Sequence, residues 1–251
     1  MRVVVEFVSC FPTGRHYPGI AHLLRVVAAG LADECEAECL LEDLPIVAID
    51  TETTGMDSSV DRIVEIACVI WQRGEVIARH SWLVNPGRSI PQEAFEVHGI
   101  GDDDVQGKPT FAEIAGEVIA VLGSSVPLAY NAEYDRAILM AELARAGVLS
   151  GRLPPAVRKG VDWIDPLVWA RELQKADKGK SLGEVCARLG IALPRAHRAA
   201  DDAEATLRVM ASFSGDMRVP KTYAAFLAEQ RRLARVFADD RTRWRPQRVT
   251  S

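Results

Sequence analysis

Residues 46–55 constrain the fold of this chain more than any other segment, because four apolar residues run directly into two carboxylates and a glycine. A short run rich in Ile and Val is typical of a central strand that is covered on both faces. Side chains alternate along a strand, so Asp50 and Glu52 point to one side and Thr51 to the other. Two anions on one face repel each other unless a cation or a raised pKa compensates, and a hard divalent ion is the simplest solution. A solvated strand-to-loop turn is the alternative that this segment alone leaves open.

Three further segments are predicted to be strands. Residues 63–71 and 76–84 are separated by a short turn, which indicates an antiparallel hairpin beside the first strand, and residues 126–130 form another buried strand. The predicted helices are a short one opened by Pro91, one from Thr110-x-x-Glu113 to near Gly123, one that Asn131 caps and that runs to about Gly147, one after Ser181-x-x-Glu184, and one over residues 199–210. This order predicts an α/β fold with a mixed central sheet flanked by helices.

The chain is expected to contain one main domain and two flanking segments. With 251 residues, of which 48% are hydrophobic and 26% charged, it can form one sizeable core. We place the main domain at residues 45–214, an N-terminal extension at 1–44, and a basic C-terminal helix and tail at 215–251. In the extension, residues 2–9 indicate a strand and residues 20–31 an amphipathic helix. This helix packs on its own domain in the simpler interpretation, and forms a homodimer or docking contact in the other.

The charge distribution limits how the chain could contact nucleic acid. Its net charge of -5 argues against a protein that coats nucleic acid through bulk charge, so any such contact is local or metal-assisted. Residues 216–251 are the exception, with nine Lys or Arg against four Asp or Glu. We interpret this tail as a solvated helix that starts at Pro220 and frays at its end, and a nucleic-acid-tracking arm is the alternative.

Cysteine usage and hydropathy indicate the compartment. The five cysteines are odd in number, scattered and without a CxxC pair, which favours neither a disulfide framework nor a zinc site. A reducing, cytoplasmic location is therefore expected. The opening apolar run is broken by Glu6 and no stretch approaches the length of a bilayer-spanning helix, so we expect neither a secretory signal nor a membrane contact.

Three separated clusters carry the residues expected to do chemistry, and each ends a predicted strand or opens a predicted helix. They are Asp50 and Glu52, then Asn131-Ala132-Glu133-Tyr134-Asp135, and then His197-Arg198-Ala199-Ala200-Asp201-Asp202. Four carboxylates and a histidine in one cleft meet the needs of two-metal phosphodiester hydrolysis, in which two hard cations hold the attacking water and the leaving oxygen. An imidazole can accept the proton of that water near neutral pH.

These clusters resemble the three exonuclease motifs of the DEDDh branch of the DnaQ-like, ribonuclease H-like 3'-to-5' exonuclease superfamily. The matching motifs are Asp50-x-Glu52-Thr53-Thr54-Gly55, Asn131-Ala132-x-x-Asp135 and His197-x-Ala199-x-x-Asp202, and the segments 62–67, 95–100 and 109–111 agree as well. The resemblance covers about residues 45–212 and is strongest to the proofreading exonuclease subunits of bacterial DNA polymerase III. It implies a ribonuclease H-like exonuclease fold.

The resemblance also implies a role for each matched residue. Asp50, Glu52, Asp135 and Asp202 would hold two Mg²⁺ ions, for which Mn²⁺ would substitute, and His197 would be the general base. The spacing of the third motif selects Asp202 over Asp201. The residues expected to contact the terminal nucleotide are Thr51, Thr53, Thr54, His98, Asn131 and Tyr134. Tyr134 stands where the family often has Phe, which keeps a stacking surface and adds a hydroxyl that could alter the preference between DNA and RNA.

Other candidates have simpler structural interpretations. Asp165 before Pro166 is expected to cap a helix, and Glu65 to orient a neighbouring group, and neither is expected to bind metal. Residues 102–104 are expected to begin a helix, whose dipole favours acidic groups there. Trp163 and Trp169 are expected to serve packing.

The sequence therefore predicts a metal-dependent 3'-to-5' exonuclease that removes nucleoside 5'-monophosphates from the 3' end of single-stranded or frayed DNA. Two alternatives remain. One is a 3'-to-5' exoribonuclease. The other is a nucleic-acid-binding subunit of a replication or repair assembly, with a DNA polymerase or a repair subunit as its partner.

Overall fold

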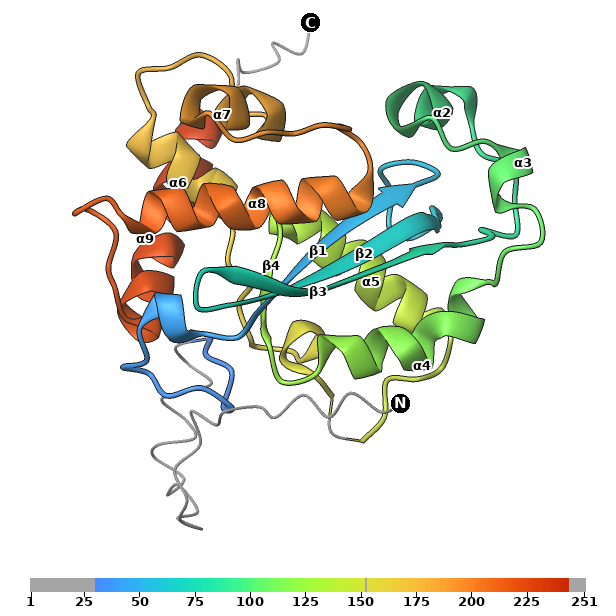
Figure 1. The fold of residues 1–251 in the computed structure, drawn as a ribbon, viewed down its shortest axis with the longest axis horizontal. Coiled ribbons are helices and arrows are strands. Elements are labelled where there is room, and N and C mark those ends of the chain that lie inside the picture. The colour runs from blue at the N-terminus through green and yellow to red at the C-terminus, as the bar shows by residue number, and fades with distance from the viewer. Residues whose placement is uncertain (1–29, 152, 244–251) are drawn as a thin grey trace, which may run out of the picture.

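A four-stranded mixed sheet forms the centre of the protein, in the strand order β3-β2-β1-β4 (Figure 1). The computed structural model describes residues 30–151 and 153–243. The strands are β1 (Ile46–Thr53), β2 (Ile63–Gln72), β3 (Glu75–Leu83) and β4 (Val126–Leu128). The pairs β1–β2 and β2–β3 are antiparallel, whereas β1–β4 is parallel. The predicted hairpin and the mixed sheet are confirmed.

Helices cover both faces of this sheet. The helical segments are η1 (Leu41–Asp43), α2 (Gln92–His98), α3 (Asp102–Val105), α4 (Phe111–Leu122), α5 (Ala132–Arg145), η2 (Pro155–Val157), α6 (Pro166–Leu173), α7 (Leu182–Leu189), α8 (Ala199–Ser214) and α9 (Tyr223–Arg243). In Figure 1, α8 crosses one face of the sheet, and α4 and α5 lie on the other side. The predicted capping boxes are present at the starts of α4 and α7, and α3 starts with the three consecutive acidic residues.

Alternation along β1 divides the core into two layers. Ile46 and Ala48 belong to the cluster that includes α8, whereas Val47 and Ile49 belong to the cluster that includes α4 and α5. Every one of these four side chains is buried, as expected for a strand covered on both faces. The same alternation continues into the polar end of the strand, where it determines which helix each polar side chain meets.

The C-terminal helix α9 differs from the expected solvated helix. Tyr223, Phe226, Leu227 and Leu233 are buried in the core cluster that also contains Trp169 of α6. The rings of Trp169 and Phe226 stack with their centroids 4.8 Å apart. The interpretation as a solvated helix is therefore wrong for this inner face, because the basic residues that suggested it alternate with an apolar stripe at helical spacing.

Other differences from the sequence predictions are small or cannot be compared. The strand predicted over residues 126–130 ends at Leu128, and α9 begins at Tyr223 rather than at Pro220. The strand predicted over residues 2–9 and nearly all of the helix predicted over 20–31, with its homodimer contact, lie outside the described residues. Among the helices of residues 30–151 and 153–243, none combines the length and the apolarity needed to cross a membrane.

Candidate active site

The polar end of β1 presents carboxylates to one helix and hydroxyls to another. Asp50 and Glu52 follow the alternation of Ile46 and Ala48, so they lie on the α8 side of the sheet. Thr51 and Thr53 lie on the opposite side, where they contact α5. Glu52 is buried, and Asp50 interacts electrostatically with Asp135, Asp202, Glu52 and Glu65. One strand end therefore brings together acidic groups from β1, β2, α5 and α8.

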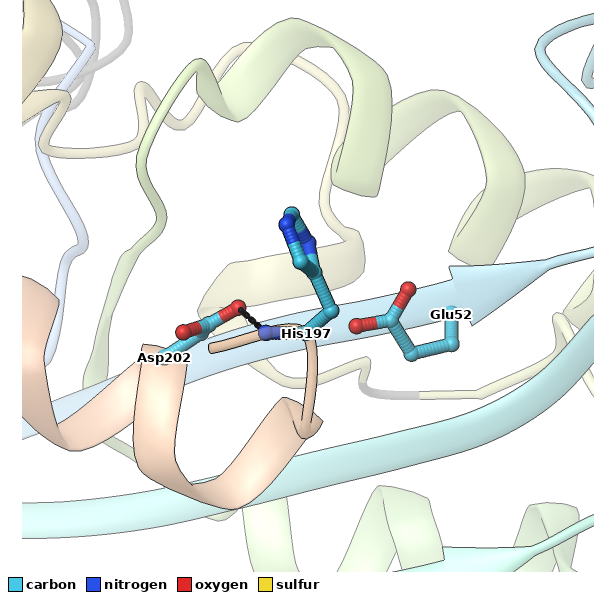
Figure 2. A group of neighbouring side chains, drawn as sticks. All are labelled: Glu52, His197 and Asp202. Carbon is cyan, nitrogen blue, oxygen red and sulfur yellow. Dashed lines mark hydrogen bonds between the residues drawn. The ribbon is translucent and has the colours of Figure 1, made fainter. Parts of the chain in front are cut away.

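Figure 2 shows that Glu52, His197 and Asp202 gather where the start of α8 crosses β1. One ligand atom from each of these residues lies within 4.8 Å of the other two. His197, at φ 65°, adopts the left-handed conformation, and its backbone N–H donates to Asp202 Oδ2 at 3.0 Å. The other oxygen of Asp202, Oδ1, is buried and has no hydrogen-bond partner among residues 30–151 and 153–243. Asp201, by contrast, accepts a hydrogen bond from Arg195 at 2.8 Å and is absent from this cluster.

Asp135 reaches the site from the first turn of α5. It is buried, and its Oδ1 accepts a hydrogen bond of 2.8 Å from the hydroxyl of Thr51. The Thr51 side chain, expected to contact substrate, is thus used to orient a carboxylate. Sequence alternation predicted the direction in which Thr51 points, but its partner is 84 positions away in the chain.

Burial raises the pKa of all four motif carboxyl groups, and repulsion by neighbouring motif carboxylates adds to the shift for Asp50 and Glu52. The pKa of Asp50 rises well above its usual value, first through burial and then through the negative charges of Asp135 and Asp202. Burial, followed by the charge of Asp202, raises the pKa of Glu52 to about 8. Burial raises the pKa of Asp135 to about 7 even though the Thr51 hydrogen bond opposes the shift. The pKa of Asp202 is also raised, chiefly by burial. These shifts mean that the site is electrostatically unfavourable without a cation.

The residues expected to contact the nucleotide surround this cluster, but most of their polar atoms are already bonded. The hydroxyls of Thr53 and Tyr134 contact each other at 2.5 Å and both approach Gly55 O. The Thr54 hydroxyl donates to Asp61 Oδ1 at 2.9 Å. The prediction that these residues contact a nucleotide therefore rests on their backbone groups, on their apolar atoms and on the ring face of Tyr134.

His98 is tied into the backbone by both ring nitrogens. Its Nδ1 accepts a hydrogen bond from Ile100 N at 3.1 Å, so the neutral ring carries its proton on Nε2 and donates it to Thr53 O at 3.3 Å. Burial lowers the pKa of His98, which favours this neutral form. His98 thus fixes the carbonyl group of the last residue of β1.

Asn131 precedes α5, as predicted, but its side chain does not cap the helix. At φ 64° and ψ 51° it adopts the left-handed conformation, and its side chain makes no capping hydrogen bond. Its backbone N–H instead donates to Asp165 Oδ1. Asp165 also caps α6 by accepting from Leu167 N at 2.9 Å, so its predicted role as a cap is confirmed.

One ion pair at the site was not identified from the sequence. Arg198 donates to Glu65 Oε1 at 3.2 Å, and Ala199 N donates to Glu65 Oε2 at 3.3 Å. Glu65, which pairs directly with Glu52 across β1 and β2, therefore anchors the start of α8 to the sheet. The signal available in the sequence was a cation directly after His197, together with a glutamate in the neighbouring strand. The prediction that Glu65 orients a neighbouring group is in accord with these bonds.

The donor set fits a divalent cation. Carboxylate oxygens are the ligands that Mg²⁺ and Mn²⁺ prefer, and Asp202 Oδ1 is a buried acceptor that lacks a donor. Glu52, Asp202 and His197 converge closely enough to share an ion. Both oxygens of Glu65 are occupied by protein donors, so Glu65 is set apart from the free ligands.

Comparison with known proteins supports an exonuclease fold. Residues 47–210 match the exonuclease family RNase_T. The chain is 32% identical over 176 residues to a PolC-type DNA polymerase III of Thermotoga petrophila, which covers 68% of this chain and 12% of that polymerase. It is 33% identical over 168 residues to the epsilon subunit of DNA polymerase III from Treponema pallidum, covering 67% of this chain and 75% of that subunit. The chain thus spans about an eighth of the PolC-type relatives that it matches.

Solved structures show the same fold. Exonuclease X in complex with duplex DNA that has a 5' overhang aligns with a TM-score of 0.57 and 25% identity, over 74% of this chain and 98% of the other. Exonuclease I of E. coli in complex with a dT13 oligonucleotide aligns with a TM-score of 0.60 and 17% identity, over 69% of this chain and 41% of the other.

Proposed function

We propose a function from one premise: the chain belongs to the exonuclease family RNase_T. It is a 3'-to-5' exonuclease that hydrolyses the terminal phosphodiester bond of single-stranded or frayed DNA and releases nucleoside 5'-monophosphates. The observation that supports this most directly is the convergence of Glu52, His197 and Asp202, with a buried Asp202 oxygen that no group in the described part of the chain satisfies.

Asp50, Glu52, Asp135 and Asp202 would hold two divalent cations, Mg²⁺ or in its place Mn²⁺. When bound, such ions activate the attacking water and stabilise the charge on the leaving oxygen. The four carboxylates supply the negative charge that retains the ions, and their raised pKa values reflect first their burial and, for Asp50 and Glu52, also the charges of the other acidic groups.

His197 is the proposed general base. Its ring lies beside Glu52 and Asp202 while the residue as a whole is exposed, so the ring can accept the proton of the attacking water and release it to solvent. The hydrogen bond from its backbone N–H to Asp202 fixes the distance between the base and a proposed metal ligand. Glu65 fixes the next two residues, Arg198 and Ala199.

The proposed substrate is DNA. The hydroxyl of Tyr134, which could have favoured RNA, contacts Thr53 and donates its proton to Gly55 O, and is therefore not free to donate to a ribose hydroxyl. Relatives of this chain include polymerase III proteins, which supports a replicative polymerase as the protein partner. His98, Thr53, Thr54 and Asn131 are proposed to shape the nucleotide pocket through the backbone around the end of β1 and the start of α5.

Digestion of matched DNA and RNA oligonucleotides, labelled at either end, tests this function. In Mg²⁺ the parent chain should shorten single-stranded DNA from its 3' end and release nucleoside 5'-monophosphates. Asp202→Asn should reduce the rate by about 100-fold or more, because it removes a ligand of the reaction centre. Asp201→Asn is the matched control, since Asp201 pairs with Arg195 outside the cluster, and it should digest DNA as the parent does.

Three outcomes would contradict the proposal. Equal rates for Asp202→Asn and the parent would show that the reaction does not take place at this site. Faster digestion of RNA than of DNA would favour the exoribonuclease, and binding of DNA without digestion would favour a binding subunit.

A further inference from the structure

A series of hydrogen bonds runs from Gln230 in α9 through Asp165 to the start of α5. From this series we infer that Gln230 is a positioning residue for the active site. Gln230 lies in α9, beyond the end of the exonuclease family match at residue 210. It is 6% exposed and therefore a buried polar group in the core. The inference deepens the proposed function and rests on it for the identity of the site that is positioned.

Both polar atoms of the Gln230 side chain bind the backbone that precedes α6. Oε1 accepts a hydrogen bond from Asp165 N at 2.9 Å, and Nε2 donates to Trp163 O at 2.9 Å. Because the side chain is buried, water does not compete for these groups, and either one left unpaired costs free energy. Gln230 therefore determines where the backbone of Asp165 lies.

Asp165 transmits this placement to α5. Its Oδ1 accepts from Asn131 N at 3.0 Å, and its Oδ2 accepts from Ala132 N at 3.3 Å. These are donors at the start of α5, which the Asn131 side chain does not satisfy. Asn131 itself is held in a left-handed conformation, which costs a non-glycine residue free energy unless its surroundings fix it.

The start of α5 carries Tyr134 and Asp135, so its position determines the position of Asp135. Thr51 fixes Asp135 from the strand side through one hydrogen bond, and Asp165 fixes the helix backbone from the other side. Loss of the Gln230 contacts should let the start of α5 shift. The expected consequences are weaker cation binding and a slower chemical step, with the substrate contacts elsewhere unaffected.

Two variants on α9 separate positioning from packing. Gln230→Met keeps the length and volume of the side chain and removes both hydrogen bonds. Leu233→Ala is the control, because Leu233 is also buried on α9, where it packs in the apolar core, and its side chain has no polar group. Both variants should lower the melting temperature of the full chain, and only Gln230→Met should alter the active site.

The readouts are calorimetric titration with Mn²⁺ and steady-state digestion of a DNA oligonucleotide. Gln230→Met should raise the Mn²⁺ dissociation constant about 3- to 10-fold, somewhat less than direct loss of a group that contacts a metal ligand. It should lower kcat by a similar factor, and KM should rise as well, because Asn131 and Tyr134 of the proposed nucleotide pocket also lie at the start of α5. Leu233→Ala should match the parent in both measurements. Asp165→Asn should give the same effects as Gln230→Met, and the two changes together should be less than additive.

Equal Mn²⁺ affinity and equal kcat for Gln230→Met, Leu233→Ala and the parent would overturn the inference. If Gln230→Met does not fold, Gln230→Leu replaces it, since an apolar side chain can neither accept from Asp165 N nor donate to Trp163 O. The control Leu233→Ala stays the same. Parental values for a folded Gln230→Leu would then equally overturn the inference. If the parent digests no nucleic acid, the proposed function fails, and the Mn²⁺ titration still decides whether Gln230 positions the carboxylates.

Discussion

Replacing Asp202 by Asn should stabilise the metal-free protein while abolishing its activity. Asp202 and Glu52 present oxygens within 4.8 Å of each other, and Asp202 Oδ1 is buried without a donor. Two full charges at that separation repel by about 3 kcal/mol at an effective dielectric constant of about 20. In Asp202→Asn the amide nitrogen can take the place of Oδ1, so the buried position no longer carries a charge, and the remaining oxygen can still accept from His197 N.

The effect should depend on pH in a defined direction. In the folded state the pKa of Glu52 is raised to about 8 and that of Asp135 to about 7, so the folded chain binds more protons than the unfolded chain between about pH 4 and 8. The free energy of unfolding of the metal-free parent should therefore fall as pH rises through this window. Asp202→Asn should reduce that slope, because it removes one charge that raises the pKa of Glu52.

Differential scanning calorimetry in EDTA, at pH 5.5 and pH 8.0, measures this effect. At pH 8.0 partial screening of the repulsion leaves an expected increase of about 2 kcal/mol in the free energy of unfolding of Asp202→Asn over the parent. For a domain of this size, that increase corresponds to a melting temperature higher by about 4–8 °C. At pH 5.5 Glu52 is protonated, so the difference in melting temperature between Asp202→Asn and the parent should approach zero. Mg²⁺ should raise the melting temperature of the parent and leave that of Asp202→Asn almost unchanged.

Asp201→Asn provides the control for this experiment. It removes a carboxylate that forms an exposed pair with Arg195, so its stability should change by less than about 1 kcal/mol at either pH. A lower melting temperature for Asp202→Asn at pH 8.0 in EDTA would refute the reasoning. So would a Mg²⁺ response equal to that of the parent.

Three further substitutions test separate parts of the structure. Thr51→Val removes the hydroxyl that lowers the pKa of Asp135, so at limiting Mg²⁺ the loss of rate on acidification should begin at a higher pH than in the parent. Thr51→Ser should keep the parental pH–rate profile, and identical profiles for all three proteins would contradict the role of the hydroxyl. Phe226→Ala should lower the free energy of unfolding by about 3–5 kcal/mol in urea, whereas a change under about 1 kcal/mol would mean that α9 does not pack on Trp169. Arg62→Met leaves the buried carboxylate of Glu142 without its bidentate partner and should cost about 3 kcal/mol in the same assay, and a stability equal to the parent would show that Arg145 suffices.

Local chemistry explains which parts of the fold the sequence predicted well. The hairpin of β2 and β3, the capping boxes of α4 and α7, and the acidic start of α3 depend on residues close together in the chain. The candidate site was predicted from motif spacing, and the structure brings Glu52, His197 and Asp202 together, although the role of each residue stays a prediction.

Long-range partners explain what the sequence did not predict. The packing of α9 depends on an apolar stripe whose partner is α6, and the surrounding arginines hid that stripe. The cap of α5 comes from Asp165, which is 34 positions beyond Asn131, and not from Asn131 itself. Local rules placed the start of α5 correctly, but the predicted cap by the Asn131 side chain is wrong, because the acceptor for these backbone donors comes from Asp165.

The alternation of β1 connects these observations, because one strand serves both faces of the sheet at its polar end. Its carboxylates face α8 and the proposed cations, and its hydroxyls face α5 and hold Asp135 and Tyr134 in place. A shift of one residue in the register of β1 would exchange the two sets, placing threonines at the cation site and carboxylates against α5. The buried apolar residues Ile46 to Ile49 prevent that shift, since it would also exchange the layers of the core. The stability of the core and the arrangement of the candidate site therefore depend on the same register.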